Sequence, residues 1–157
     1  MYDYMNGLIT DVRPDGIVLE VNNIGYFINV SNPYTFEINK MSRVYLYQQV
    51  KEDELNLFGF KKKEEKELFL KLINVKGLGC KMALPILATG SINGIMEAIE
   101  RENIAYLKKF PKIGDKLARQ MILDLKGKIG SVHTLFDDNS INYTSNELHD
   151  VLIGLGY

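Results

Sequence analysis

A nine-residue pattern occurs twice in this chain and constrains its fold more than any other feature. Residues 75–83 have the sequence VKGLGCKMA, and residues 110–118, 35 positions later, have the sequence FPKIGDKLA. In both copies a glycine is followed two residues later by a lysine and four residues later by an alanine. Glycine just before a run with helical periodicity is typical of a tight turn that opens a helix. The repeat therefore predicts two helix-hairpin-helix motifs.

Each predicted turn has the chemistry of a phosphate-binding site. The first N–H groups of a helix have no partner within the helix, and they lie at the positive end of its dipole. Glycine lets a ligand approach the backbone closely, and lysine adds a mobile positive charge. One such turn usually only connects two helices, but two copies with the same lysine offset favour phosphate binding. The candidate contact residues are Lys76, Gly77, Gly79 and Lys81 in the first copy and Lys112, Gly114 and Lys116 in the second.

The second copy departs from the first at two positions. Lys112 occupies the place of Gly77. If the turn needs a positive φ there, the lysine is strained; if it does not, the lysine adds a cation. Asp115 directly follows Gly114, where it can cap the new helix but would also repel a phosphate.

The positive charge of the chain is concentrated around the repeat. The formal net charge is −1 at pH 7, which by itself argues against a nucleic-acid partner. Residues 61–130 nevertheless carry 15 Lys and Arg against 8 Asp and Glu, a surplus of +7, while residues 1–60 and 131–157 each have a net charge of −4. Because phosphates are neutralised by local basic patches, this segregation favours polyanion binding by the middle segment.

Composition argues against several other classes of protein. The chain is 46% hydrophobic and 25% charged, as in ordinary globular proteins. No apolar run approaches the ~20 residues of a membrane span, and the N-terminus lacks a signal-peptide pattern, so we expect a cytoplasmic protein without membrane association. The single cysteine, Cys80, excludes an internal disulfide, and His133 and His149 are too far apart to indicate a metal cluster. We expect no metal and no cofactor.

Residues 1–60 have the pattern of a small β-barrel. Alternating hydrophobic residues predict strands at 7–13, 16–21, 25–30, 43–50 and 56–60, with a loop or short helix at 33–40. Five short strands suit a closed barrel of the OB-fold type. OB-folds often bind nucleic acid through aromatic residues. This segment is acidic, however, and we interpret Tyr26, Phe27 and Tyr45 as core and cross-strand residues.

From residue 61 the hydrophobic period becomes helical. It predicts helices at 61–74, 80–88, 92–101, 104–110 and 115–126. Ser91 and Asn103 are candidate N-caps, and Pro85 is expected to bend or shorten the second helix. The predicted fold class is α+β multidomain, with an N-terminal OB-fold barrel (residues 1–60) followed by an all-α tandem helix-hairpin-helix domain (residues 61–130).

The remaining segments predict a linker and an incomplete module. Residues 131–145 show no sustained period and suit a flexible linker. In residues 146–157, Leu148, Val151 and Leu152 have helical spacing, and Thr144 and Glu147 precede them at capping-box spacing. One short helix cannot bury its apolar face alone, so we interpret this segment as the start of a small C-terminal helical domain.

An acidic turn separates the last two predicted strands. Three consecutive carboxylates, Glu52, Asp53 and Glu54, usually mean only a solvated turn. Neighbouring residues at such a turn point in different directions, and no histidine, nucleophile or third ligand accompanies them, so neither catalysis nor Mg²⁺ binding is expected. On a protein that binds phosphates elsewhere, a negative turn can repel nucleic-acid strands from a place that they should not occupy.

The order of these parts resembles the RuvA family of bacterial proteins, which bind Holliday junctions during branch migration. The resemblance extends over the whole chain. It includes VNNIGY at residues 21–26, KEDELNLFGF at 51–60, the two hairpins, DLKGK at 124–128 and LGY at 155–157. The Phe-Gly-Phe sequence after an acidic turn, together with the paired hairpins, is highly specific.

The resemblance implies a non-catalytic subunit of an ATP-dependent branch migration complex in homologous recombination and DNA repair. Members of the family form a homotetramer, or an octamer of two tetramers, on an open four-way junction. Gly77, Gly79 and Lys81 match the first phosphate-binding hairpin of the family, and Gly114 and Lys116 match the second. These contacts carry no base code, so binding would depend on junction shape rather than on sequence.

The resemblance also assigns a role to the acidic turn and implies protein partners. Glu52 and Asp53 match the acidic pin of the family, which repels phosphates at the crossover. A hexameric ATPase motor, RuvB, binds the C-terminal domain, and the RuvC resolvase is a further partner. The chain has no G-x-x-x-x-G-K-[ST] loop of its own. Because family members continue beyond Tyr157, we expect a 157-residue form to bind junctions but to recruit the motor poorly.

Two other functions fit part of the pattern. A helix-hairpin-helix DNA glycosylase has a lysine in the hairpin helix and an aspartate further along the chain, and Lys116 with Asp137 mimics that spacing. Asp137 falls in the predicted linker, however, where neither burial nor a helix cap would position it. In the other alternative the chain is a scaffold without DNA affinity, whose hairpins only pack helices and whose binding would be nearly independent of salt.

Overall fold

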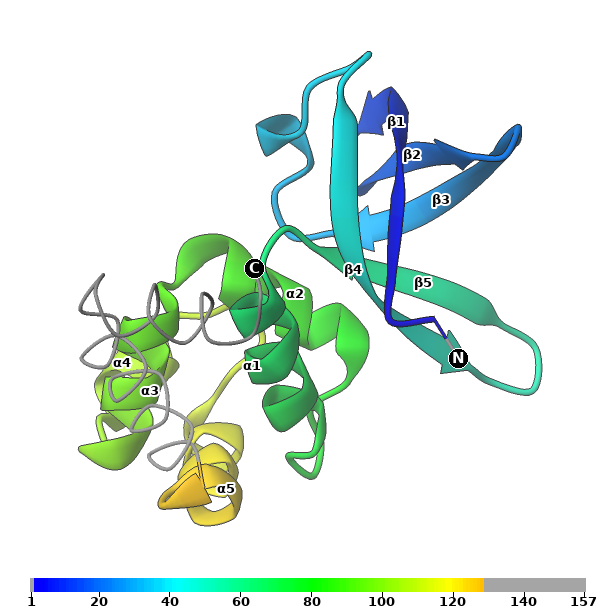
Figure 1. Ribbon diagram of the computed structural model, residues 1–157. Coiled ribbons are helices and arrows are strands. Elements are labelled where there is room, and N and C mark those ends of the chain that lie inside the picture. Colours follow the sequence, from blue (N-terminus) through cyan, green and yellow to red (C-terminus); the bar gives the residue numbers. More distant parts are fainter. Residues whose placement is uncertain (1, 129–157) are drawn as a thin grey trace, which may run out of the picture.

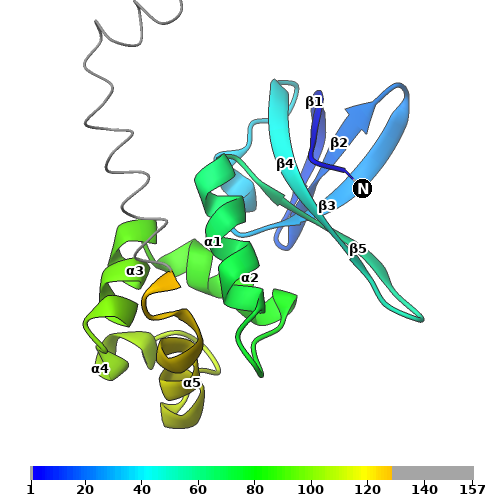
Figure 2. The ribbon, with the colours of Figure 1, turned by 60° about the horizontal axis from the view of Figure 1, so that its bottom comes forward.

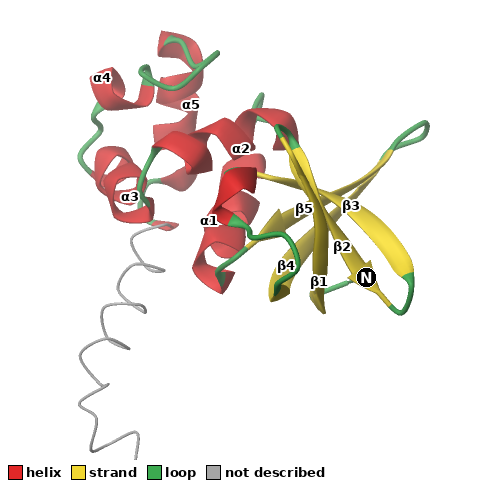
Figure 3. Cartoon of the chain, turned by 90° about the horizontal axis from the view of Figure 1, so that it is seen from above, coloured by secondary structure: helices red, strands yellow, loops and turns green. Residues whose placement is uncertain are grey.

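The computed structural model describes residues 2–128, which form a β-barrel joined to a group of helices (Figure 1). Figure 3 shows the strands gathered on one side of the molecule and the helices on the other. The predicted order of a barrel followed by a helical region is confirmed. The predicted linker (residues 131–145) and C-terminal helix (residues 146–157) lie outside the described residues. The elements are β1 (Tyr4–Arg13), β2 (Gly16–Val21), β3 (Ile24–Val30), the 3-10 helix η1 (Pro33–Thr35), β4 (Met41–Val50), β5 (Leu55–Phe60), α1 (Lys63–Ile73), α2 (Cys80–Thr89), α3 (Ile92–Glu100), α4 (Ile104–Leu107) and α5 (Asp115–Leu125).

The five strands close into a barrel in the order β1-β2-β3-β5-β4. All neighbouring strands are antiparallel except β3 and β5, which pair in parallel and complete the closure. Asn22 and Asn23 have φ of +51° and +65° and connect β2 to β3. Positive φ at both central residues is the geometry of a two-residue type I′ hairpin, which asparagine tolerates better than most residues. Closure leaves no unpaired sheet edge of the kind that promotes aggregation.

The Phe-Gly-Phe sequence of β5 joins the barrel to the helices. Phe58 and Phe60 are buried and pack against Phe69 of α1, with ring centroids 5.6 and 4.8 Å away. Successive side chains of a strand point to opposite faces, so Gly59 faces the barrel interior. A Cβ atom at Gly59 would lie 2.5 Å from Ile28 Cγ2 and 2.6 Å from Val44 Cγ1. Only glycine fits this position, while its two neighbours contribute to the helical core.

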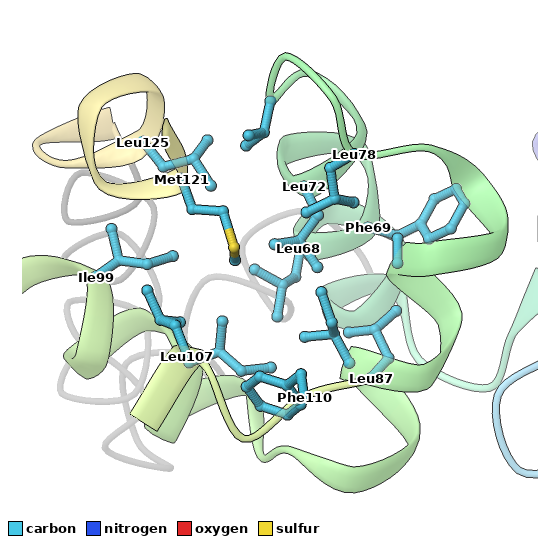
Figure 4. Packing of buried hydrophobic residues seen from close by; sticks show 14 of the residues in the cluster. Leu68, Phe69, Leu72, Leu78, Leu87, Ile99, Leu107, Phe110, Met121 and Leu125 are labelled. Atoms are coloured by element: carbon cyan, nitrogen blue, oxygen red, sulfur yellow. The ribbon is translucent and has the colours of Figure 1, made fainter. Parts of the chain in front are cut away.

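The helices pack around one apolar core, shown in Figure 4. The helical period places Leu68, Phe69, Leu72 and Ile73 on one face of α1. The first three are buried, and Ile73 is partly buried against the same core. The same core includes apolar residues from both hairpins and from α5, so the hairpins are part of the packing and not loops attached to it. In short helices such as these, tertiary packing of the apolar face contributes most of the stability.

The predicted helix caps are confirmed. The Ser91 side chain accepts a hydrogen bond from the N–H of Gly94, and the Asn103 side chain accepts one from the N–H of Tyr106. Pro85 lies inside α2, yet α2 continues to Thr89, so the proline does not shorten the helix.

Several predicted boundaries differ from the structure by one to three residues. Strands β1 and β4 begin at Tyr4 and Met41, earlier than predicted, because these two strands pair with each other over residues 4–8 and 41–45. Helix α4 ends at Leu107 and not at residue 110, because residues 108–110 continue as a tighter turn. There the N–H groups of residues 109 and 110 bond to carbonyls three positions earlier.

No single helix within residues 2–128 is long and apolar enough to cross a membrane. Helices α2 and α3 reach that length and composition only when taken together, and they are bent by 107° relative to each other.

Candidate nucleic-acid interface

The two hairpins have the same backbone geometry. Residues 75–78 and 110–113 each form a four-residue turn closed by a hydrogen bond from the last N–H to the first carbonyl, at 3.1 and 3.3 Å. The third residue of each turn has a positive φ, +92° at Gly77 and +65° at Lys112, and the second does not. These are the features of a type II turn. The position therefore does require a positive φ, and Lys112 adopts it at a conformational cost that Gly77 avoids.

Buried apolar residues fix both ends of each turn. Val75 and Leu78 are buried at the first turn, and Phe110 and Ile113 at the second. The two middle residues of each turn are exposed. The middle of each hairpin therefore faces solvent while its ends belong to the core.

The glycines that follow the turns are not explained by the fold of the chain itself. Gly79 and Gly114 are the N-cap residues of α2 and α5, with φ of −94° and −97°. Any residue can adopt this backbone conformation. A Cβ atom at either position would meet no atom within 4 Å. Neither conformation nor packing requires glycine here, so the missing side chains leave room for something outside the chain.

Unused backbone donors gather at both sites. Within residues 2–128, no hydrogen bond occupies the N–H groups of Gly77, Gly79, Lys112 or Gly114. The helix that follows each glycine adds the free N–H groups of its first turn and the positive end of its dipole. This arrangement is a ready-made site for an anion such as phosphate.

The predicted lysines lie on the surface around these donors. Lys76, Lys81, Lys112 and Lys116 are all exposed. Lys81 lies beside the acidic turn, with its Nζ 4.0 Å from Glu54 Oε1. Both side chains are largely exposed, so this pair is weak and leaves the lysine available to a phosphate.

Asp115 does not cap α5. The helix begins at Asp115 itself, and the N-cap residue Gly114 has no side chain. The carboxylate instead forms an ion pair with Lys108 at 3.0 Å. A hydrogen bond and the positive charge of Lys108 lower the pKa of the Asp115 carboxyl. Because Lys108 neutralises part of its charge, Asp115 repels a phosphate at the second hairpin less than the sequence alone indicates.

The acidic turn projects beyond the barrel at the end of the β4–β5 hairpin (Figure 2). The N–H of Lys51 donates to the Glu54 carbonyl at 2.8 Å and closes the turn. Glu52 and Asp53 are exposed, and neither carboxylate has a hydrogen-bond or ion-pair partner in the part of the chain that the structure describes. In Figure 2 this turn and the α1–α2 hairpin extend from the body of the molecule in the same general direction.

The described residues contain no group of three or more His, Cys, Asp or Glu side chains that could hold a metal ion. Cys80 is buried at the start of α2, and burial raises the pKa of its thiol. Asp137, the aspartate of the glycosylase alternative, and both histidines lie outside the described residues.

Three contributors to the site were not predicted as site residues. Lys108 pairs with Asp115, Glu54 lies near Lys81, and Asp124 accepts a hydrogen bond from the N–H of Lys76. The interaction of Asp124 spans 48 positions, so no local sequence signal could have identified it.

A barrel followed by two hairpins with unused backbone donors defines a class, the DNA-binding proteins with tandem helix-hairpin-helix motifs. Residues 1–59 match a family model described as the RuvA N terminal domain, and residues 69–128 match one described as a SAM-like helix-hairpin-helix tandem. The chain belongs to the RuvA family, because relatives that are 43–48% identical match it over its whole length.

Curated relatives agree over the full length of this chain. A protein of Pediococcus pentosaceus is 48% identical over 161 residues, which cover 100% of this chain and 83% of the relative. Proteins of Streptococcus gordonii and Leuconostoc mesenteroides are 43% and 44% identical, over 100% of this chain and 84% of each relative. All three are named Holliday junction branch migration complex subunit RuvA.

We predict opposite stability effects at the third position of the two turns. Lys112→Gly should raise the free energy of unfolding by about 0.5–1 kcal/mol, because it removes a positive-φ lysine. Gly77→Ala should lower the free energy of unfolding by about 1–2 kcal/mol, because it introduces a side chain at a positive φ. A Cβ at Gly77 would approach only Leu117 Cδ1, at 3.7 Å, so steric crowding does not contribute to the effect of Gly77→Ala. Urea unfolding measures both changes, and the same sign for the two variants would contradict the assignment.

Proposed function

We propose that this chain binds four-way DNA junctions as the RuvA subunit of a branch migration complex, in homologous recombination and DNA repair. Membership of the RuvA family and the printed names of its relatives support this proposal. Neither the glycosylase nor the scaffold alternative gains support from the relatives. The chain would be a non-catalytic DNA-binding subunit, with the ATPase supplied by RuvB.

The observation that carries the proposal is the pair of glycines at the hairpin helices. Gly79 and Gly114 have ordinary backbone conformations and open space where a side chain would be. A fold without a ligand would accept serine, threonine, asparagine or aspartate at both N-cap positions at least as well as glycine. A phosphate held by the N–H groups at the start of α2 and α5 requires that space, because a side chain would keep the phosphate away from the donors.

The charges around the hairpins suit the backbone of a duplex. Lys76 and Lys81 at the first site, and Lys112 and Lys116 at the second, would neutralise neighbouring phosphates. Two sites held in one rigid core fit two positions along a sugar-phosphate chain. Because phosphates are the same in every sequence, such contacts select DNA by shape and not by base.

The acidic turn would make the chain prefer a four-way junction to a linear duplex. Glu52 and Asp53 lie at the end of a projecting hairpin and are not neutralised within the described residues. A duplex passing over this turn would bring phosphates against two carboxylates. A junction with separated arms offers an open centre that can receive the turn, so repulsion favours the junction.

The assembly and its partners extend this proposal. We propose a homotetramer, or an octamer of two tetramers, on the junction, with a RuvB hexamer and the RuvC resolvase as protein partners. The barrel with its acidic pin would occupy residues 1–60, the DNA-binding helices 61–130, a linker 131–145 and the first part of the RuvB-binding domain 146–157. A cytoplasmic location, without cofactor or metal, fits this role.

We predict that Gly79→Ala with Gly114→Ala weakens junction binding while the chain stays folded. The methyl groups would occupy the space that a phosphate needs, so the dissociation constant should rise at least about tenfold, or 1.4 kcal/mol. The free energy of unfolding should fall by no more than about 1 kcal/mol, because alanine is a poorer N-cap than glycine but reduces the entropy of the unfolded chain. Gel shifts with a four-way junction and with linear duplex of equal length, together with urea unfolding, measure both quantities.

Gly25→Ala is a suitable control because Gly25 lies in the barrel, away from both hairpins. It should leave junction binding unchanged. Full binding by the Gly79→Ala, Gly114→Ala protein would refute the phosphate sites, and equal binding of junction and duplex by the parent chain would refute the proposed function.

Salt dependence separates phosphate contacts from apolar docking. The logarithm of the binding constant falls with the logarithm of salt concentration by about 0.9 per phosphate contact. Lys81→Ala with Lys116→Ala should therefore reduce the slope by about 2 if both lysines contact phosphates. A gel-shift series over salt concentration measures the slope. An unchanged slope would show that neither lysine contacts a phosphate, and a nearly flat slope in the parent chain would favour the scaffold alternative.

Neutralising the acidic turn should reduce selectivity and not affinity. We predict that Glu52→Gln with Asp53→Asn strengthens binding to linear duplex and reduces the preference for a junction, because the repulsion of phosphates is lost. Asp15→Asn with Glu37→Gln changes the net charge equally at exposed barrel positions and should alter the preference much less. Competition between labelled junction and unlabelled duplex measures this preference for the junction. If the turn variant keeps the parent preference, the turn has no role in selection.

A further inference from the structure

Asp124, in the last turn of α5, connects the two hairpins. Its Oδ1 accepts a hydrogen bond from Gln120 Nε2 at 2.9 Å, and its Oδ2 accepts one from the N–H of Lys76 at 3.1 Å. Both bonds lower the pKa of the Asp124 carboxyl, which favours the ionised acceptor. Lys76 is the second residue of the first turn, whereas α5 starts at the second hairpin. One helix therefore opens the second phosphate site at its N-terminus and holds the first site near its C-terminus.

The repeat shows why only the first hairpin needs such a partner. The residue equivalent to Lys76 in the second turn is Pro111, which has no N–H and has a fixed φ suited to the second position of a type II turn. The position equivalent to Asp124 in the first copy is Thr89, whose hydroxyl donates to the carbonyl of Pro85 in its own helix. The second turn is thus fixed by a covalent ring, and the first by a carboxylate from another motif.

The first hairpin also lies near the start of α5. A Cβ at Gly77 would lie 3.7 Å from Leu117 Cδ1, so the turn passes close to the first turns of α5 as well as to its last turn. Two phosphate sites act together only if their separation matches the DNA backbone, and contacts between the first hairpin and α5 set that separation.

We infer that Asp124 is a positioning residue for DNA binding, which acts by holding the backbone of the first hairpin at Lys76. This inference rests on the proposed function and adds a residue that does not itself contact the DNA. Loss of the carboxylate would leave the Lys76 N–H to water and free the turn to move relative to the second site.

The test is a cycle of substitutions at positions 124 and 76. Asp124→Ala should weaken junction binding about fivefold in the parent chain, since it removes a hydrogen bond to a charged group. It should weaken binding about as much in a Lys76→Ala background, which loses the cation but keeps the N–H. In a Lys76→Pro background, where no N–H remains and the turn is fixed as in the second hairpin, Asp124→Ala should change binding by less than about twofold.

The background dependence distinguishes positioning from general stabilisation of α5. An equal loss in the Lys76→Pro and Lys76→Ala backgrounds, or no loss in the parent chain, would overturn the inference. Val75 before a proline is sterically restricted, but Phe110 before Pro111 accepts the same restriction in the same turn. Thermal unfolding establishes whether the proline variant folds.

A measurement without DNA separates this inference from the proposed function, and it applies even if the proline variant does not fold. Amide hydrogen exchange at Lys76 in the free full-length chain should accelerate on the order of tenfold in Asp124→Ala, with barrel amides unchanged. Unchanged exchange at Lys76 would overturn the inference. If the parent chain shows no preference for junctions but Lys76 exchange does accelerate, the proposed function fails while the contact stands.

Discussion

The type II turn between paired helices is the constraint on which the rest of this structure depends. Its ends are buried apolar residues and its third residue has a positive φ. The chain then turns sharply enough for the next helix to begin two residues later, at Cys80 in one copy and Asp115 in the other. The unused N–H groups of that helix consequently lie beside the exposed turn. Core packing and the exposed backbone donors are two consequences of the same geometry.

The two copies reach this geometry by different chemistry. The first has Gly77 at the positive-φ position and no proline, so its backbone is intrinsically loose and Asp124 holds it from α5. The second has Pro111, which fixes one residue of the turn, beside Lys112, which accepts strain and adds a charge. Similar turns can therefore result from glycine with a tertiary contact or from proline without one.

The barrel places an acidic turn beside a basic surface. Packing of Phe58 and Phe60 on Phe69 fixes β5 against α1, and the β4–β5 turn extends from the end of that strand. Glu54 comes within 4.0 Å of Lys81 at the first hairpin. Opposite charges at this distance on a surface attract weakly, but both act on an approaching polyanion. The lysines would attract its phosphates, while Glu52 and Asp53 would repel phosphates from the end of the β4–β5 turn.

Much of this architecture could be predicted from the sequence because its causes are local. Alternation predicted the strands, the helical period predicted the helices, and Ser91 and Asn103 marked two helix starts. The ends of β1, β4 and α4 were wrong by a few residues, since strand pairing and the tight turn at residues 108–110 decide them. The positive φ at position 112 follows from the type II turn, which the sequence alone did not define.

The sequence by itself determined that two glycine-lysine hairpins follow an acidic barrel, because repeats, periodicity and charge are properties of neighbouring residues. Only the tertiary structure decided that Asp115 pairs with Lys108, that Gly79 and Gly114 border open space, and that Asp124 holds the first hairpin. Each of these depends on which distant atoms meet or fail to meet, and that follows from the packing of α4 and α5 around the common core.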